Sequence, residues 1–115
     1  MSAWQPETGA GLHTRVVAGR ELIFDADGFL HRFEDWSGEL FEALARESGL
    51  TALDERHWRV VRFMRDYYAS NGRAPLNRQL TAGTGMSLME LQKAFPEGIK
   101  YGARRMAGLP NPKSC

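Results

Sequence analysis

Residues 51–72 have the sequence TALDERHWRVVRFMRDYYASNG, the strongest helical pattern in the chain. Apolar and ring-bearing side chains recur there every three or four residues, which places them on one face of a helix. They are His57, Val60, Val61, Met64, Tyr67 and Tyr68. Thr51 through Asp54 resembles a capping box that opens the helix, and Asn71-Gly72 favours a left-handed stop. We expect His57 to be a core or boundary histidine with a hydrogen-bond partner.

Two shorter helices are predicted after it, separated by Gly83-Thr84-Gly85. Pro75 can occupy the first position of the first helix, and Ser87 through Glu90 forms a capping box for the second, which Pro96 interrupts. The first helix places Leu76 and Leu80 together, and the second is expected to bury Leu88, Leu91 and Phe95. Residues 76–95 therefore have the outline of a helix-turn-helix.

Two further helices flank these three. The first should begin at Trp36, be capped by Asp35 and end at Gly49. Its apolar face carries Trp36, Leu40, Phe41 and Leu44. The last helix is expected near residues 99–107, and Gly108 should end it. Its apolar side carries Ile99, Ala103 and Met106.

The N-terminal part of the chain has a β pattern instead. Arg15-Val16-Val17 and Glu21-Leu22-Ile23-Phe24 are short β-forming runs, and Ala18-Gly19-Arg20 between them suggests a hairpin turn. Asp25-Ala26-Asp27-Gly28 is a second turn signal. Its Asp-x-Asp spacing lacks the rest of a calcium loop, so we interpret it as a plain turn.

The predicted fold is α+β and predominantly α: a small helical domain with an N-terminal β-hairpin, a helix-turn-helix-like pair and a flexible C-terminal arm. We expect a loose N-terminal arm over residues 1–13 and a single globular domain over 14–107. Residues 108–115 should form a mobile C-terminal arm that carries the cysteine.

Composition excludes several classes of function. The 115 residues are 43% hydrophobic and 25% charged, which is typical of one globular core. A net charge of +1 gives no global attraction to nucleic acid or to a membrane surface. No apolar run approaches the roughly 18 residues of a membrane span. The N-terminus does not resemble a secretory signal and there is a single cysteine, so we expect a cytoplasmic protein without an intramolecular disulfide.

Metal-binding and catalytic patterns are scarce. His13, His31 and His57 have no ligand spacing, and no second cysteine is present to help bind zinc. We predict no metal and no cofactor.

The chemically distinctive residue is Cys115, at the tip of the segment Ala107-Gly-Leu-Pro-Asn-Pro-Lys-Ser-Cys115. A thiol can attack as a soft nucleophile or carry a second sulfur atom, and most structural cysteines are buried instead. Pro110 and Pro112 should keep this tail extended and outside the fold, with Gly108 and Leu109 at its start. We therefore predict that Cys115 is the reactive group of the protein.

Basic residues precede the tail and accompany it: Lys100, Arg104, Arg105 and Lys113. They form either a solvated helix face or a docking patch for an acidic partner or RNA phosphate. DNA binding through residues 76–95 is the alternative from another class of function. It is disfavoured because the exposed positions of the second helix include Glu90 and only one cation, Lys93.

The C-terminal string resembles the signature tail of the DsrC/TusE family of sulfur-relay proteins. Further segments follow the family pattern in the same order, so that the resemblance covers roughly residues 15 to 115. These are Asp27-Gly28-Phe29-Leu30, Asp35-Trp36, Leu44-Ala45, Leu53, His57-Trp58, Arg65-Asp66-Tyr67-Tyr68, Pro75, Arg78, Leu80 and Phe95-Pro96-Glu97-Gly98.

The resemblance implies that Cys115 accepts a persulfide sulfur from a donor protein complex and passes it to an acceptor enzyme. The protein would then be a sulfurtransferase-like carrier that acts with partner enzymes. DsrC proper has a second arm cysteine at the position of Arg104, so this chain is more similar to single-cysteine TusE-like members, which relay sulfur to the wobble uridine of tRNA. Indirect or direct tRNA contact is then possible. A DsrC-like carrier of dissimilatory sulfur oxidation or sulfite reduction remains the alternative within the family.

Overall fold

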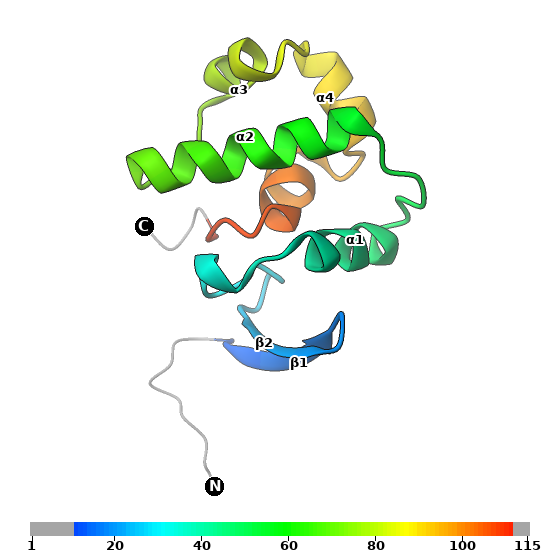
Figure 1. The fold of residues 1–115 in the computed structure, drawn as a ribbon, viewed down its shortest axis with the longest axis vertical. Helices are drawn as coiled ribbons and strands as arrows, with labels where there is room; N and C mark the ends of the chain where they lie inside the picture. The colour runs from blue at the N-terminus through cyan, green and yellow to red at the C-terminus, as the bar shows by residue number, and fades with distance from the viewer. Residues whose placement is uncertain (1–10, 112–115) are drawn as a thin grey trace, which may run out of the picture.

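The computed structural model describes residues 11–111, and the statements below concern these residues. Figure 1 shows α2 crossing the molecule, with α3 and α4 on one side and η3, α1 and the β-hairpin on the other. The elements are β1 (His13–Val17), β2 (Arg20–Phe24), η2 (Phe33–Asp35), α1 (Gly38–Glu47), α2 (Glu55–Asn71), α3 (Asn77–Thr84), α4 (Leu88–Ala94) and η3 (Ile99–Arg104). The predicted α+β, mainly helical fold is confirmed.

The hairpin pairs β1 and β2 antiparallel, from His13 opposite Phe24 to Val17 opposite Arg20. Its turn is two residues long, because Arg20 already belongs to β2. Ala18 and Gly19 both have positive φ, 54° and 76°, as the tight hairpin turn with matching twist requires. His13 lies in β1, so the loose arm predicted over 1–13 overlaps the hairpin at its end. Residues 1–10 lie outside the described part.

Two predicted helix starts are wrong, because another polar residue nearby makes the cap. Ser37, not Asp35, caps α1 by accepting from the backbone N–H of Leu40 at 3.1 Å. Phe33–Asp35 form the short 3-10 helix η2 instead, and Trp36 has an extended backbone. Asp54, not Thr51, caps α2.

The helix-turn-helix-like pair is present, with two local differences from the prediction. Pro75 precedes the cap residue Leu76 rather than standing inside α3, and the Leu76 N–H donates to Gln79 Oε1 at 2.8 Å. The predicted capping box of Ser87 and Glu90 is confirmed. Leu88, predicted to be buried, is 41% exposed, and Leu76, predicted to lie beside Leu80, is 55% exposed, because each lies at the start of its helix.

One hydrophobic core joins the hairpin, all the helices and the segment after η3. The predicted last helix begins as a π-helix over Ile99–Arg104, and Gly108 with φ +76° ends the turn that follows. The core continues past this point, because Leu109 has no exposed surface. Within residues 11–111, no helix is both long and apolar enough to cross a membrane.

Candidate functional site: the base of the C-terminal arm

The arm predicted over residues 108–115 begins inside the fold. We call Gly108–Asn111 the arm base. Leu109 is fully buried and Asn111 is 8% exposed, so the packed part of the chain continues past the predicted boundary at residue 107. The prolines were expected to keep this segment outside the fold. The burial of the apolar Leu109 side chain in the core outweighs that tendency. Pro112, Lys113 and Cys115 lie outside the described residues.

Trp36 holds the first residue of the arm base. Its indole Nε1–H donates to the carbonyl of Met106 at 2.9 Å. A Cβ atom built on Gly108 would lie 2.6 Å from Trp36 Cδ1. Since Gly108 also has a left-handed backbone, only glycine fits here without strain. The ring thus lies directly against the chain where η3 ends and the arm begins.

Arg65 of α2 contacts the same place from the other side. Its Nη1 donates to the carbonyl of Ala107 at 2.9 Å, and its Nη2 donates to the carbonyl of Phe33 at 3.0 Å. The guanidinium carbon lies 3.8 Å from the ring centroid of Phe33 and 4.4 Å from that of Trp36. Burial lowers the pKa of Arg65 to about 10, so the side chain remains charged at neutral pH. Arg65 therefore joins α2, η2 and Ala107, the residue just before the arm base.

Asn111 ends the described part of the arm on two carboxylates. Its Nδ2 amide donates to Asp25 Oδ2 at 3.1 Å and to Asp27 Oδ2 at 2.7 Å. Both acids belong to the turn Asp25–Gly28, which we call the carboxylate turn. Asp25 also organises this turn, because its Oδ1 accepts from the backbone N–H groups of Asp27 and Phe29, each at 2.9 Å.

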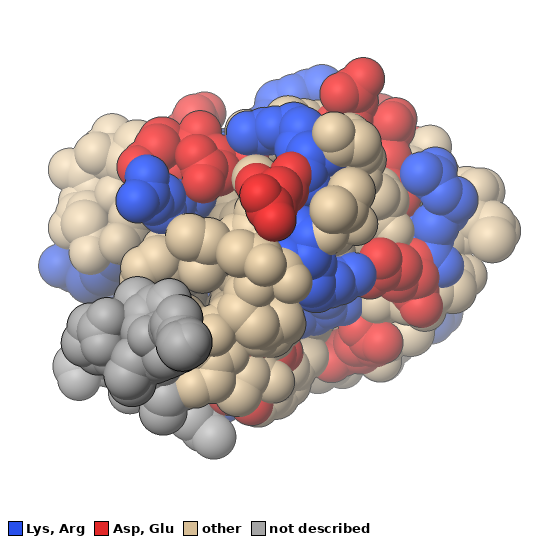
Figure 2. Space-filling view, turned by 90° about the horizontal axis from the view of Figure 1, so that it is seen from below, with Lys and Arg blue, Asp and Glu red and all other residues tan. Residues whose placement is uncertain are grey.

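The predicted basic patch is not a set of equivalent exposed cations. Arg105 donates through Nη2 to Ser48 Oγ at 2.8 Å and to Glu97 Oε1 at 3.1 Å, and its side chain is only 13% exposed. It is engaged with residues of the fold, and its predicted role in docking stays a prediction. Arg104 is partly buried, whereas the Nζ of half-buried Lys100 lies 4.9 Å from the ring centroid of Tyr101. On the face in Figure 2, basic and acidic side chains alternate instead of gathering by sign.

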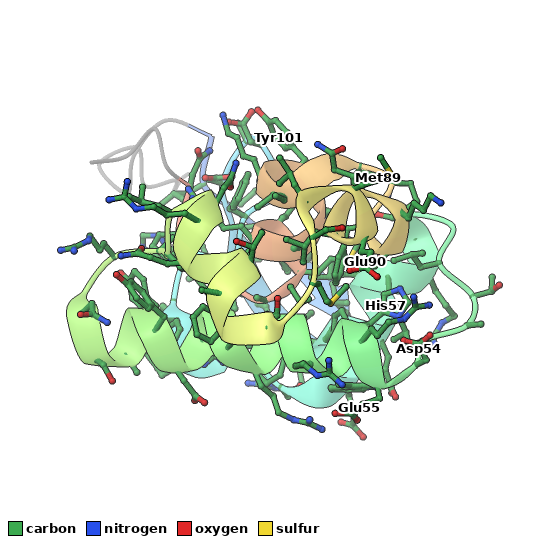
Figure 3. The ribbon with its side chains drawn as sticks, turned by 90° about the horizontal axis from the view of Figure 1, so that it is seen from above. Asp54, Glu55, His57, Met89, Glu90 and Tyr101 are labelled. Atoms are coloured by element: carbon green, nitrogen blue, oxygen red, sulfur yellow. The ribbon has the colours of Figure 1, made fainter. Side chains whose placement is uncertain are left out.

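His57 has the structural role predicted for it. Its Nδ1 accepts from the backbone N–H of Asp54 at 3.1 Å, which completes the capping box, and its Nε2–H donates to the carbonyl of Ala94 at 2.9 Å. The ring is 6% exposed and links α2 to α4. Figure 3 shows it beside Asp54 at the start of α2. Among residues 11–111, no group of three or more His, Cys, Asp and Glu side chains is arranged to hold a metal ion.

The exposed face of the helix-turn-helix-like pair is weakly charged. On α4 the outward residues are Met89, Glu90, Gln92 and Lys93, and Figure 3 shows Met89 and Glu90 on this side of the molecule. Met89 is 67% exposed. A phosphate-binding helix would be expected to carry several cations here, so the geometry of the pair adds no support for DNA binding.

The sequence pattern alone predicts no contact for the residues that hold the arm base. Asn111 lies between two prolines, and Asp25 and Asp27 are predicted to form a turn. Arg65, Trp36 and Asp27 did appear among the segments that resemble the sulfur-relay family, which was the single signal pointing to them. Their contacts join parts of the chain that are far apart in sequence: 70 residues separate Trp36 from Met106.

Comparison with known proteins places this architecture among sulfur-metabolism proteins. The profile of the family described as "DsrC like protein" matches residues 16–115. The gamma subunit of dissimilatory-type sulfite reductase from Nitratidesulfovibrio vulgaris is 41% identical over 97 residues, covering 84% of this chain and 92% of the relative. Sulfurtransferase TusE of Sodalis glossinidius is 36% identical over 104 residues, covering 84% and 95%. A chain in the crystal structure of dissimilatory sulfite reductase I superposes with a TM-score of 0.84 at 39% identity, covering 90% of this chain and 99% of that one.

Proposed function

This chain belongs to the DsrC-like protein family, and on that premise we propose that it is a sulfur carrier whose Cys115 holds sulfur as a persulfide. The observation that carries the proposal is that the fold holds the chain as far as Asn111, four residues before its lone cysteine. Relatives named as a sulfurtransferase and as a sulfite reductase subunit support a role in sulfur transfer. The carrier acts with partner enzymes in the cytoplasm.

The proposed chemistry is two successive thiol exchanges. The Cys115 thiolate attacks the outer sulfur of a donor persulfide, the donor S–S bond breaks, and the donor leaves as a thiolate. Cys115 then holds the sulfur as Cys–S–SH. An acceptor thiolate attacks that outer sulfur, a new S–S bond forms on the acceptor, and the Cys115 thiolate is released. Each step replaces one S–S bond by another, so no external oxidant or reductant is needed.

Arg104 bears on the destination of the sulfur. A cysteine at this position, at the end of η3, would allow a disulfide with Cys115, and an arginine does not. A chain with one thiol suits relay from protein to protein, as in thiolation of the tRNA wobble uridine. Delivery to a dissimilatory sulfite reductase system is the second candidate, which the 41% identity to a gamma subunit favours.

The proposed partners are a sulfur-donor protein complex and a downstream acceptor enzyme. The docking candidates are Lys100, Arg104, Arg105 and Lys113, of which Arg105 also binds Ser48 and Glu97. A tRNA contact, direct or through the acceptor enzyme, belongs to the same proposal.

Replacement of the thiol tests the proposed function. We expect Cys115→Ser to take up no sulfur from a radiolabelled small-molecule persulfide. The variant should still fold normally, which is checked by comparing its circular dichroism spectrum with that of the wild type. The matched variant Ser114→Cys/Cys115→Ser moves the thiol by one residue and should again take up label. Uptake by Cys115→Ser would overturn the proposal, because that variant contains no cysteine.

A further inference from the structure

The contact between Asn111 and the carboxylate turn consists of two hydrogen bonds to charged acceptors. One amide nitrogen donates to two carboxylate oxygens, at 3.1 Å and 2.7 Å, and hydrogen bonds to charged acceptors are among the stronger ones in proteins. Asn111 is 8% exposed, so this contact lies mostly outside solvent. Its neighbour Leu109 is already fixed by complete burial. The core is therefore closed before the chain reaches Asn111.

Hydrogen bonds and ring packing also fix the carboxylate turn, which supplies the acceptors for Asn111. Asp25 accepts two backbone N–H groups through Oδ1, which leaves Oδ2 directed at Asn111. The turn itself is closed by the hydrogen bond from the Gly28 N–H to the Asp25 carbonyl at 3.0 Å. Phe29 at its end packs on Tyr101, with ring centroids 5.7 Å apart. Strand β2 and η3 thus fix the carboxylate turn from both sides.

We propose that Asn111, bound to Asp25 and Asp27, is a positioning residue that sets where the arm leaves the domain and thereby limits how far Cys115 reaches. This inference rests on the proposed function of Cys115. Four residues follow Asn111, and four extended residues span at most about 14 Å. A partner must therefore bring its reactive sulfur within that distance of the carboxylate turn, which makes this turn and neighbouring Tyr101 part of the docking face.

Losing this contact lengthens the arm without opening the core. Leu109 is then the last residue that complete burial holds, and Cys115 lies six residues beyond it instead of four beyond Asn111. Six extended residues span at most about 21 Å, so the reach of the thiol grows by about 7 Å. Asn111→Asp should produce this state, because it puts a third carboxylate beside Asp25 and Asp27.

The experiment measures the distance from Cys115 to the domain directly. Nitroxide labels are attached to Cys115 and to a cysteine introduced by Arg62→Cys, since Arg62 is exposed on α2. Pulsed electron resonance then gives the distance distribution. We expect Asn111→Asp to extend its long-distance limit by about 7 Å. Adding Asp27→Asn should shift the distribution back towards the original, because an amide at position 27 can donate to the new carboxylate at position 111, while the Asp25 carboxylate still faces it. Asn77→Asp, which adds the same charge at an exposed site on α3, should change nothing.

Two outcomes would overturn the proposal: an unchanged distribution in Asn111→Asp, or no recovery in the double variant. If Asn111→Asp does not fold, Asn111→Ala removes the donor without adding charge and should extend the distances in the same way. Sulfur uptake from a small persulfide is measured on variants that carry no spin label and keep Arg62, so that Cys115 is their single thiol. It should stay at the wild-type level. If the wild type itself takes up no sulfur, the proposed function fails. This result is distinct from an unchanged distance distribution, which contradicts only the proposed role of Asn111.

Discussion

Gly108 combines a left-handed backbone with a contact that leaves no room for a side chain. Its φ is +76°, and a Cβ atom would lie 2.6 Å from Trp36 Cδ1. Gly85 has nearly the same φ, +73°, but nothing within 4 Å of its Cβ position. The two glycines therefore separate the cost of the backbone conformation from the cost of the contact.

We expect Gly85→Ala to lower the free energy of unfolding by about 1–2 kcal/mol, the cost of a left-handed conformation for an L-residue. Gly108→Ala should lower it by about 1–3 kcal/mol more, because the methyl group displaces Trp36 from the arm base. Urea unfolding followed by circular dichroism measures both values. If the two variants lost the same free energy of unfolding, the displacement of Trp36 by the added methyl group would have no energetic cost.

Single residues also show why the site was only partly predictable from the sequence. A lone cysteine after a Pro-x-Pro segment can be recognised directly, and Gly108 was correctly predicted to end a helix. The anchor could not be recognised, because Asn111 lies 86 and 84 residues from Asp25 and Asp27. Similarly, nothing local distinguishes Arg105, an internal ion-pair partner, from an exposed cation. Such contacts depend on the packing of separate elements.

At the scale of elements, periodicity predicted most helices and strands, whereas their starts were less predictable. The apolar stripe of α2 places His57, Val60 and Met64 in the core as expected. The start of a helix depends instead on which of several neighbouring polar residues has an extended backbone. Ser37 and Asp54 have it and form the caps, although Asp35 and Thr51 were equally plausible from sequence.

The cap of α2 should make the stability of the protein depend on pH. Hydrogen bonding by the Arg56 side chain, helped by the backbone N–H groups of Arg56 and His57, lowers the pKa of Asp54 from 3.8 to about 2. A carboxyl whose pKa is lower in the folded state stabilises that state above its unfolded pKa. The stabilisation is fully present above about pH 4 and is lost as pH falls from 3.8 towards 2.

Asp54→Asn keeps an oxygen acceptor at the cap but removes the charge. We expect the variant to be less stable than the wild type at pH 5 and the difference to shrink steadily as pH falls to 2. Urea midpoints measured at half-unit pH steps give this difference. Glu55→Gln removes a charge from the neighbouring position, which accepts no backbone hydrogen bond of the cap, and should show a weaker trend. A constant difference for Asp54→Asn would contradict the argument.

At the scale of the whole molecule, the domain ends later than its sequence suggests. Gly108 and the prolines that follow it are the usual signals for the end of a folded unit, and they led to a boundary at residue 107. The structure instead inserts Leu109 into the core and binds Asn111 to the carboxylate turn. The C-terminal segment thus contributes to the stability of the fold and not only to its reactivity.

Two truncations test where the folded unit ends. Removing residues 113–115 leaves every contact described above in place and keeps the new terminal carboxylate off Asn111, so we expect a free energy of unfolding close to that of the wild type. Removing residues 109–115 also deletes Leu109, which has no exposed surface, and should cost about 2–5 kcal/mol, the range for emptying a buried leucine site. Both chains lack Cys115 and neither should take up sulfur, so urea unfolding alone distinguishes them. If both truncations had the same small effect, the fold would end before the arm base, and Asn111 could not serve as the point from which the reach of the thiol is measured.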